Sequence, residues 1–219
     1  MARYLIHACP KRMWYVESYL IPSLLKQGIS ENEISVYNDS EGLGNLRACM
    51  NAFASCEGKG GIWHIQDDVC ICRDFKERTE KYDKGLVCGF SSKMYDGSAM
   101  SKIGFVPREK MWFSFPCIRI PNYMARGCAE WVTTQIIGNP VYKRFWEKGV
   151  NDDWAFRAYL KNFHTDAVAL NITPNLVDHI DYLIGGGTGQ KGPRKEPCRA
   201  QYWEDEDVVK ELEGKLNGR

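Results

Sequence analysis

Two adjacent carboxylates, Asp67 and Asp68, follow an apolar segment at residues 61–66 and are the side chains of this sequence best suited to chemistry. Two neighbouring carboxylates repel each other, and burial raises the cost of keeping both charged. A divalent cation removes the repulsion, and hard oxygen ligands suit Mg²⁺ or Mn²⁺, which commonly bridge substrate phosphates. A turn with two solvated acids is the alternative. The position after an apolar strand favours a metal site, because open α/β sheets bind ligands beyond the carboxyl ends of their strands.

A second acidic group, Asn151-Asp152-Asp153, opens a predicted helix. A helix N-terminus favours the ionised form of a carboxylate, and an ionised carboxylate within reach of a hydroxyl can accept its proton. Because Asn and Asp are also common capping residues, a purely structural role is the alternative. His179 could bind a metal through its neutral imidazole, or it could be an ordinary hydrogen-bonded histidine.

Loops that follow the first two predicted strands carry further polar candidates. Pro10-Lys11-Arg12 follows the first strand, and Asn38-Asp39 follows the second. Gly42-Leu43-Gly44-Asn45 then leads into a helix, but it lacks the third glycine of the dinucleotide-binding fingerprint. We interpret it as a turn that brings the helix end and Arg47 near a ligand, with plain turn glycines as the alternative. A glycine-rich basic stretch farther on holds Lys191, which could meet a diphosphate or belong to a solvated linker.

Alternating strands and helices must position these groups. Apolar runs and helical periodicity predict strands at 3–8, 34–37 and 62–65. Between them we expect a helix at 11–27, split at Pro22, and a second helix with Asn45 as its N-cap. This order favours right-handed crossovers and an α/β fold whose mixed, mostly parallel sheet has helices on both faces.

The remainder of the chain has a less regular pattern. Strands are expected at 86–90, at 114–120 and, as the last strand, at 167–172. Pro116 would place the second of these at an edge or a bulge. A loop is expected at 91–101, and helices are expected over 124–136, from Asn151 onward and at 204–216.

Length and composition limit the classes of protein that this chain can be. It has 219 residues, of which 44% are hydrophobic and 26% charged, as is ordinary for a globular domain. We expect one domain at 1–184. Residues 185–219 are expected to form a flexible basic loop and a C-terminal helix. With 29 Lys and Arg against 28 Asp and Glu, bulk charge does not favour nucleic-acid binding.

The nine cysteines include no Cys-x-x-Cys pair. They are expected to be buried free thiols in a reducing cytoplasm, and a cysteine-only zinc site is not expected. No apolar stretch reaches the length of a spanning helix, so we expect no membrane span.

These motifs together resemble those of nucleotide-sugar glycosyltransferases of the GT-A fold, of the small phage or bacterial kind. Asp67-Asp68 after a strand, following an N-terminal strand with its Pro-x-Arg loop, resembles the family's Asp-x-Asp metal motif, with Gln66 in place of the first acid. Asn151-Asp152-Asp153 resembles the second acidic motif, and the segment 173–180 resembles the family's C-terminal histidine loop. The resemblance extends over most of the chain.

The resemblance implies a donor-binding half at about 1–75, an acceptor half at about 76–184 and a role for each matched residue. Asp68 and His179 would bind Mn²⁺ or Mg²⁺, and Asp153, with Asp152 beside it, would be the catalytic base of an inverting enzyme. The residues expected to bind the nucleotide sugar are Ala8, Cys9, Pro10, Arg12, Asn38, Asp39, Gly44, Asn45, Arg47, Gln66, Asp67 and Lys191.

The expected function is therefore transfer of a sugar from a nucleoside-diphosphate sugar, most simply a UDP-sugar, to a hydroxyl acceptor. A modified DNA base is one such acceptor, with the basic patch 191–199 contacting phosphates; polysaccharides, proteins and small molecules are others. A non-catalytic nucleotide-binding module and a metal-dependent phosphoesterase are the alternatives. The main hypothesis requires that Asp67 and Asp68 face a cleft large enough for a nucleotide.

Overall fold

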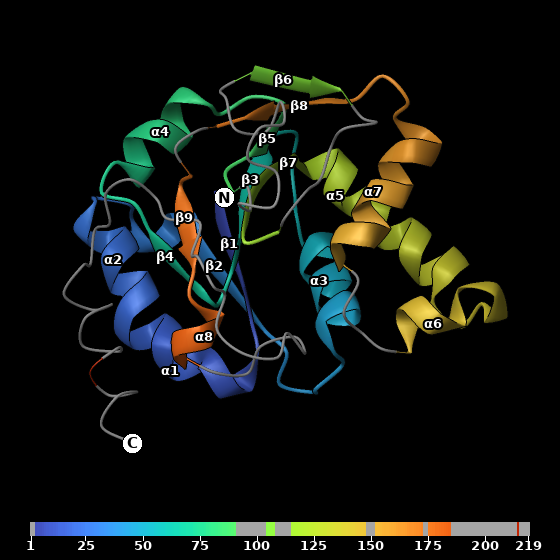
Figure 1. Cartoon of the computed structure of the whole chain (residues 1–219), viewed down its shortest axis with the longest axis horizontal. Helices are drawn as coiled ribbons and strands as arrows, with labels where there is room; N and C mark the ends of the chain where they lie inside the picture. Colours follow the sequence, from blue (N-terminus) through green and yellow to red (C-terminus); the bar gives the residue numbers. More distant parts are fainter. Residues whose placement is uncertain are drawn as a thin grey trace.

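The computed structural model describes residues 3–90, 104–107, 115–147, 152–172, 175–184 and 214. These residues form an α/β structure with a mixed seven-stranded sheet in the order β2-β1-β3-β7-β5-β8-β6 (Figure 1). The strands are β1 Tyr4–Ala8, β2 Ile34–Asn38, β3 Gly61–Gln66, β5 Leu86–Cys88, β6 Gly104–Pro107, β7 Cys117–Pro121 and β8 Val168–Asn171.

Five of these seven strands run in the same direction. Strand β1 pairs in parallel with both β2 and β3, and β5 pairs in parallel with β8. Strand β7 lies antiparallel between β3 and β5, and β6 lies antiparallel at the edge beside β8. The sequence-based expectation of an α/β fold with a mostly parallel mixed sheet is therefore confirmed at this level, and the arrangement is compatible with a Rossmann-like fold.

Two sequence-based expectations about strands are wrong. The strand expected at 114–120 begins only after Pro116 and lies in the middle of the sheet, because the proline precedes the paired segment and removes no hydrogen bond from it. The strand at 167–172 is not the last one. A separate two-stranded sheet pairs β4, Val69–Ile71, with the later β9, Val177–His179.

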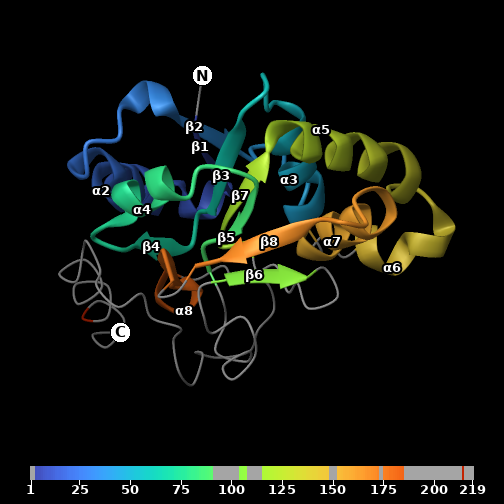
Figure 2. The ribbon, with the colours of Figure 1, turned by 90° about the horizontal axis from the view of Figure 1, so that it is seen from above.

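Helices cover both faces of the seven-stranded sheet. Helices α1, α2 and α4 lie on one face and α3, α5 and α7 on the other, as two orthogonal views show (Figures 1 and 2). The α-helices are α1 Met13–Tyr15, α2 Ile21–Lys26, α3 Asn45–Ala54, α4 Phe75–Lys81, α5 Asn122–Trp131, α6 Lys143–Trp146, α7 Asp152–Phe163 and α8 Asp181–Ile184.

The helices expected near Pro22 and Asn45 form with local differences. The predicted helix at 11–27 begins with a 3₁₀ turn at Pro10–Arg12 and passes through a π-helical turn at Val16–Leu20 before α2. Pro22 lies in the first turn of α2. Because proline has no backbone N–H, the helix lacks one backbone hydrogen bond at this position. Asn45 is the first residue of α3 and Gly44, with φ 85°, is its N-cap, so the expected capping role of Asn45 is wrong.

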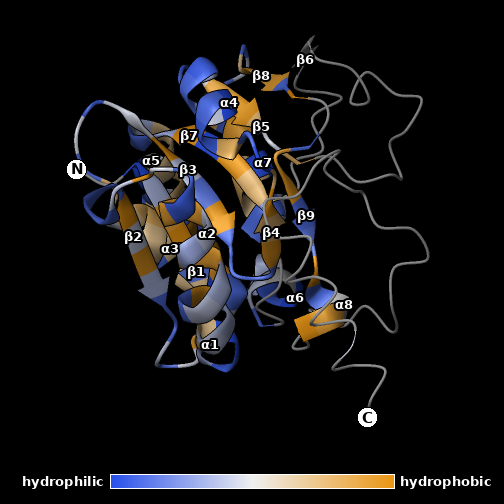
Figure 3. Ribbon diagram, turned by 90° about the vertical axis from the view of Figure 1, so that its left-hand side faces the viewer, coloured by the Kyte–Doolittle hydropathy of each residue, from blue (hydrophilic) through white to orange (hydrophobic). Residues whose placement is uncertain are grey.

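Successive side chains along each strand point to opposite faces of the sheet and so contribute to two separate hydrophobic cores. Leu5, Ile62 and Ile120 pack against α3, α5 and α7, while Tyr4 and Trp63 pack against the helices of the opposite face and β4. The hydrophobic colouring of β1, β3 and β4 marks the buried layer between the helices (Figure 3). Each face of the sheet is therefore buried, which is typical of a sheet whose neighbouring strands are joined by helices.

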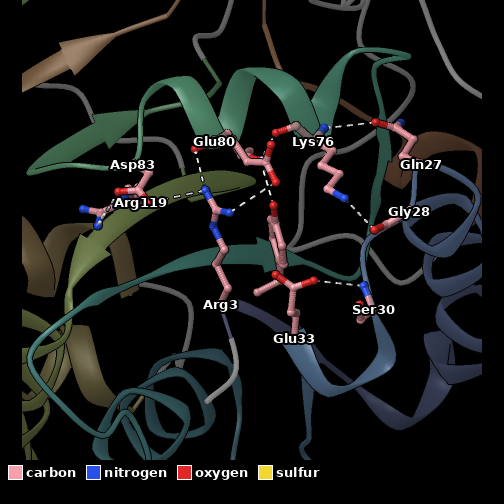
Figure 4. A network of polar contacts seen from close by, with 11 residues as sticks. Arg3, Gln27, Gly28, Ser30, Glu33, Lys76, Glu80, Asp83 and Arg119 are labelled. Atoms are coloured by element: carbon pink, nitrogen blue, oxygen red, sulfur yellow. Dashed lines mark hydrogen bonds and ion pairs between the residues drawn. The ribbon is translucent and has the colours of Figure 1, made fainter.

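Ion pairs attach α4 to β1 and to neighbouring segments (Figure 4). Arg3 lies 3.6 Å from carboxylate oxygens of both Glu80 and Asp83, and Arg119 lies 3.7 Å from the other oxygen of Asp83. Lys76 Nζ donates to the carbonyl of Gly28 at 2.6 Å. The acidic partners Glu80 and Asp83 are exposed, so these contacts contribute orientation more than stability.

The expected loop at 91–101 and the expected helix at 204–216 lie outside the described residues, apart from Gly214. Within the described residues, no helix has the length and apolarity needed to cross a membrane.

Candidate functional site

The carboxyl ends of β1 and β3 bring two loops together at one edge of the sheet. His7 and Gln66 are partners in the parallel pairing of these strands. Immediately beyond them, the Asp67 amide donates to the carbonyl of His7 at 3.1 Å, and the Cys9 amide donates to Asp67 Oδ2 at 2.7 Å. The loop that carries Arg12 and the turn that carries Asp68 therefore lie against each other.

Arg12 neutralises the two adjacent acids. Its Nη1 lies 2.9 Å from Asp67 Oδ1 and also donates to Asp68 Oδ2. Arg12 is 7% exposed, and each acid is 5% exposed. The expectation that both acids face an open cleft is therefore wrong for the described residues. Two adjacent carboxylates need a compensating charge when they are buried, and here a guanidinium supplies it.

His179 reaches the same carboxylate from the C-terminal part of the chain. Strand β9 pairs antiparallel with β4, and the Ile180 amide donates to the carbonyl of Asp68 at 2.8 Å. This pairing places His179 Nε2 3.0 Å from Asp68 Oδ2. The structure thus brings together the two residues that the sequence suggested as metal ligands, although 111 positions of sequence separate Asp68 from His179.

The two acids differ in their electrostatic state. Burial by itself would raise the pKa of Asp68, but the hydrogen bond with His179 and the charge of Arg12 outweigh it and hold that pKa below its ordinary value. Burial and the charge of Asp68 raise the pKa of Asp67, against the opposing charge of Arg12. Asp68 is therefore the acid that stays ionised most readily, as a metal ligand must.

One oxygen of this ionised group lacks a partner. Asp68 Oδ1 is buried and accepts no hydrogen bond from any residue that the structure describes. An unsatisfied buried polar atom costs about 1–3 kcal/mol, and more when it is charged. Native structures seldom retain such an atom without a water or an ion beside it. The carboxylate consequently has a free coordination position.

A second group of polar residues lies beside the first, on the α3 and α7 side of the sheet. Gln66 Nε2 donates to Asp152 Oδ2 at 3.3 Å, and the side chain of Asn45 also hydrogen-bonds to Asp152. Asp152 is 4% exposed. Burial, followed by the charge of Asp153, raises its pKa to about 7. This carboxyl group can both bind and release a proton near neutral pH.

Asp153 has a different environment from Asp152. Its Oδ1 accepts the amide of Trp154 at 2.6 Å, which is a contact within its own helix turn. Asp153 is half-buried, and burial raises its pKa. Since Asp152 is the residue that meets Gln66 beside the Asp67–Asp68 turn, the geometry favours Asp152 over Asp153 for work at this site.

The remaining candidates are distributed around the edge. Both oxygens of Asp39 accept backbone amides, from Leu43 at 2.8 Å and Gly44 at 3.0 Å, so this acid holds the turn before α3. Ala8 is buried, Cys9 is half-buried, and Pro10, Asn38 and Arg47 are exposed. Lys191 lies outside the described residues.

A cavity of about 190 Å³ lies elsewhere, at the amino ends of β1 and β3. Its lining includes Leu5, Ser35, Ile62 and Asn122 and contains none of the candidate site residues. This cavity therefore gives no support to a nucleotide site at the carboxyl edge.

Sequence reasoning missed two features of this edge. The contact between Gln66 and Asp152 joins residues 86 positions apart, and no sequence pattern reports it. His7, Cys49 and His64 gather close behind Gln66. The two histidines could have been found from the alternation of β1 and β3, because His7 pairs with Gln66 and His64 pairs with Leu5, which places all four on one face of the sheet.

No protein-family model matches this sequence, and a search of curated proteins finds no match either. Function must therefore be inferred from the residues themselves and from the edge of the sheet that they form.

Proposed function

We propose that this chain is a metal-dependent glycosyltransferase of the GT-A fold, which transfers a sugar from a nucleoside-diphosphate sugar to a hydroxyl acceptor. The observation that carries the proposal is the state of Asp68. It is an ionised, buried carboxylate at the carboxyl end of a central strand, in contact with Arg12 and His179, with one oxygen unsatisfied. A cation would bind to Asp68 and His179, and an anionic ligand would bind to Arg12.

The donor set fits a hard divalent cation. Asp68 offers a carboxylate oxygen and His179 an imidazole nitrogen, both of which Mn²⁺ accepts. His179 Nε2 lies 3.0 Å from Asp68 Oδ2, and the other oxygen of the same carboxylate, Oδ1, is the unsatisfied one, so an ion at Oδ1 would lie within reach of both side chains after a small rotation. When bound, the ion would neutralise negative charge that develops on the leaving diphosphate.

Arg12 would exchange partners when donor and cation bind. In the described state its charge compensates Asp67 and Asp68. A cation on Asp68 takes over that compensation, so the guanidinium becomes available to the diphosphate, which it can bind through two parallel hydrogen bonds. For the buried acids to belong to a binding site, Arg12, which is itself only 7% exposed, would have to move aside as the donor arrives.

Asp152 would act as the general base. With its pKa near 7, it accepts the acceptor hydroxyl proton as the acceptor oxygen bonds to the anomeric carbon. The bond between that carbon and the diphosphate oxygen breaks in the same step, so the configuration inverts. Gln66 and Asn45 hold the carboxyl group in position. This assignment moves the expected base from Asp153 to its neighbour.

The nucleoside would lie over the carboxyl ends of β1 and β2, where Ala8 and Asn38 end the strands and Cys9 follows the first of them. Asp39 supports this region by fixing the turn that begins α3, a role that differs from the direct contact with the nucleotide sugar that the resemblance implies. Asp67 accepts the Cys9 amide and so joins this loop to the acidic turn.

The proposal is tested by incubating the protein with a panel of nucleotide sugars and Mn²⁺ and measuring released nucleoside diphosphate. We expect release with at least one donor, loss of release on chelation, and loss in Asp152→Asn. Nucleotide binding without release would favour a binding module, and phosphate release without sugar transfer would favour a phosphoesterase. Absence of both binding and release with every donor contradicts the proposal.

The acceptor is tested separately. Duplex DNA with hydroxylated bases, an oligosaccharide mixture and small alcohols are each supplied with the active donor, and radiolabelled sugar is followed into product. Salt-dependent retention on duplex DNA is expected only if DNA is the acceptor, because phosphate contacts release counterions.

A further inference from the structure

We propose that His7, Cys49 and His64 form a second metal site, for a borderline or soft ion such as Zn²⁺, buried beside the acidic edge. One ligand atom from each residue lies within 4.8 Å of the other two. His64 Nε2 and Cys49 Sγ are 4.0 Å apart. In a tetrahedral zinc site a nitrogen and a sulfur ligand lie about 3.6 Å apart, so only a small closure is needed.

Three different elements supply the ligands. His7 is on β1, His64 is on β3, and Cys49 is on α3, which covers that face of the sheet. Cys49 and His64 are fully buried, and His7 is 6% exposed. A metal bound here would join the two central strands to the helix whose first residue, Asn45, supports Asp152.

The three side chains lie in a largely aromatic layer, in which His64 contacts Cys49 Sγ and the backbone of Phe115 as its polar partners. The His64 ring contacts the rings of His7, Phe53 and Phe115, at centroid distances of 5.8, 5.3 and 5.4 Å. Among the described residues, no carboxylate is hydrogen-bonded to either imidazole. Burial lowers the pKa of His7 to about 4 and that of His64 to about 3, so both rings are in the neutral form that binds metals.

Burial, and after it the charge of Asp152, raises the pKa of Cys49, so a metal would have to displace the proton of this thiol in order to bind. A bound metal would keep this thiol as a thiolate and would offset the charge of Asp152. Two imidazoles and one thiolate leave one of four coordination positions for water or another group.

This site is distinct in chemistry from the one proposed at Asp68. Imidazole and thiolate ligands favour Zn²⁺ or Co²⁺, while a carboxylate at the acidic edge suits Mn²⁺ or Mg²⁺. The inference does not depend on glycosyl transfer, since it follows from the positions of three ligating side chains.

Cobalt provides the test, because a thiolate ligand gives Co²⁺ an intense charge-transfer absorption. The metal-free protein, confirmed as folded by circular dichroism, is titrated with Co²⁺ and the band is followed to saturation. We expect one equivalent to bind in the native protein. Zn²⁺ should then displace it and remove the band.

Cys49→Ser is the decisive variant and Cys128→Ser is its matched control, since Cys128 is a fully buried thiol of the same core. We expect Cys128→Ser to keep the band and Cys49→Ser to lose it, with Co²⁺ affinity falling by more than about tenfold. Asp68→Asn should keep it, which separates this site from the acidic one. His7→Asn provides a second ligand variant if Cys49→Ser does not fold. A folded native protein without the band, or a band that persists in both ligand variants, overturns the inference.

Discussion

Asp152 illustrates how a single buried carboxyl group links stability to catalysis. Its pKa in the folded chain is about 7, against an ordinary value near 4 in the unfolded chain. Between about pH 4 and pH 7, Asp152 holds a proton in the folded chain that it has released in the unfolded chain. Stability from this group is therefore present below about pH 4 and is lost as the pH rises toward 7, while the basic form needed for catalysis appears over the same range.

Replacing Asp152 with Asn removes the ionisable group and therefore the loss of stability that accompanies its ionisation. We expect Asp152→Asn to raise the free energy of unfolding by up to about 4 kcal/mol at pH 8 and to change it little at pH 4, because three pKa units correspond to about that energy. Turnover should be lost at both values. Urea denaturation at the two pH values checks this. Equal free energies of unfolding for the two proteins at pH 8 would show that burial does not raise the pKa of the Asp152 carboxyl group.

Asp153 provides the matched control for that experiment. Its carboxylate contacts the Trp154 amide in its own helix turn, so Asp153→Asn should preserve most of the turnover. Loss of turnover in Asp153→Asn with normal turnover in Asp152→Asn would restore the assignment that the sequence first suggested.

Arg12 is the residue whose charge a metal would replace. Arg12→Gln leaves two buried acids without their counter-charge, and we expect a loss of about 3 kcal/mol of stability in the presence of a chelator. Mn²⁺ should restore more stability to this variant than it adds to the native protein, as thermal denaturation with and without Mn²⁺ can measure.

Arg47→Gln is the control for that comparison, because Arg47 is exposed and its replacement should change stability by less than about 0.5 kcal/mol. If Mn²⁺ stabilises the native protein and Arg12→Gln by the same amount, the cation does not replace the Arg12 guanidinium as the charge that compensates Asp67 and Asp68.

At the scale of elements, the contact between α5 and α7 determines where Asp152 lies. Gly127 on α5 faces Tyr159 on α7, and a methyl group at Gly127 would lie 2.1 Å from the Tyr159 hydroxyl. That hydroxyl also lies 3.2 Å from His164 Nε2. The close approach of the two helices therefore requires glycine.

Gly127→Ala tests this packing. We expect a loss of about 1–3 kcal/mol from overpacking, together with reduced turnover, because the first turn of α7 carries Asp152. Gly60→Ala is the control, since no atom lies within 4 Å of the added methyl. The double change Gly127→Ala with Tyr159→Phe should recover part of the stability. Absence of any recovery would mean that another contact is responsible.

The sequence predicted the elements better than their order in the sheet. Apolar runs and helical periodicity were sufficient for β1, β2, β3, α3, α5 and α7. The antiparallel position of β7 was not readable, because Pro116 at its start also fits an edge strand, and only the pairing with β3 and β5 decides between them. The three-residue strand β9 is too short for a period of two to be distinguished from chance.

For the molecule as a whole, the sequence likewise predicted individual residues of the site better than the contacts between them. Asp67 and Asp68 were recognisable because they follow directly on β3. Their counter-ion Arg12 lies 56 positions from Asp68, and the contact between Asp152 and Gln66 depends on how α7 packs. Side-chain types and strand ends thus predict which edge of the sheet carries polar residues, whereas the pairing of charges depends on tertiary structure.

The distribution of thiols provides a prediction for the whole molecule. The eight described cysteines are free, and seven are buried while Cys9 is half-buried at the candidate donor site. With Cys198 replaced by Ser, since it lies outside the described residues, a thiol reagent should modify Cys9 first.

Nucleotide sugar with Mn²⁺ should slow the modification of Cys9, as peptide mass spectrometry can follow. Reagent in excess after unfolding with guanidinium gives the total number of thiols as a control. Unchanged Cys9 reactivity at saturating donor would place the nucleotide away from β1.

Binding of Mn²⁺ at Asp68 is the central claim, and electron paramagnetic resonance of free Mn²⁺ tests it most directly. Relative to a blank that holds the same nucleoside diphosphate without protein, native protein should remove about one further equivalent of the free-ion signal, and Asp68→Asn, folded to the same extent, should remove almost none. Equal removal by both proteins, or none by the native protein, would contradict the account.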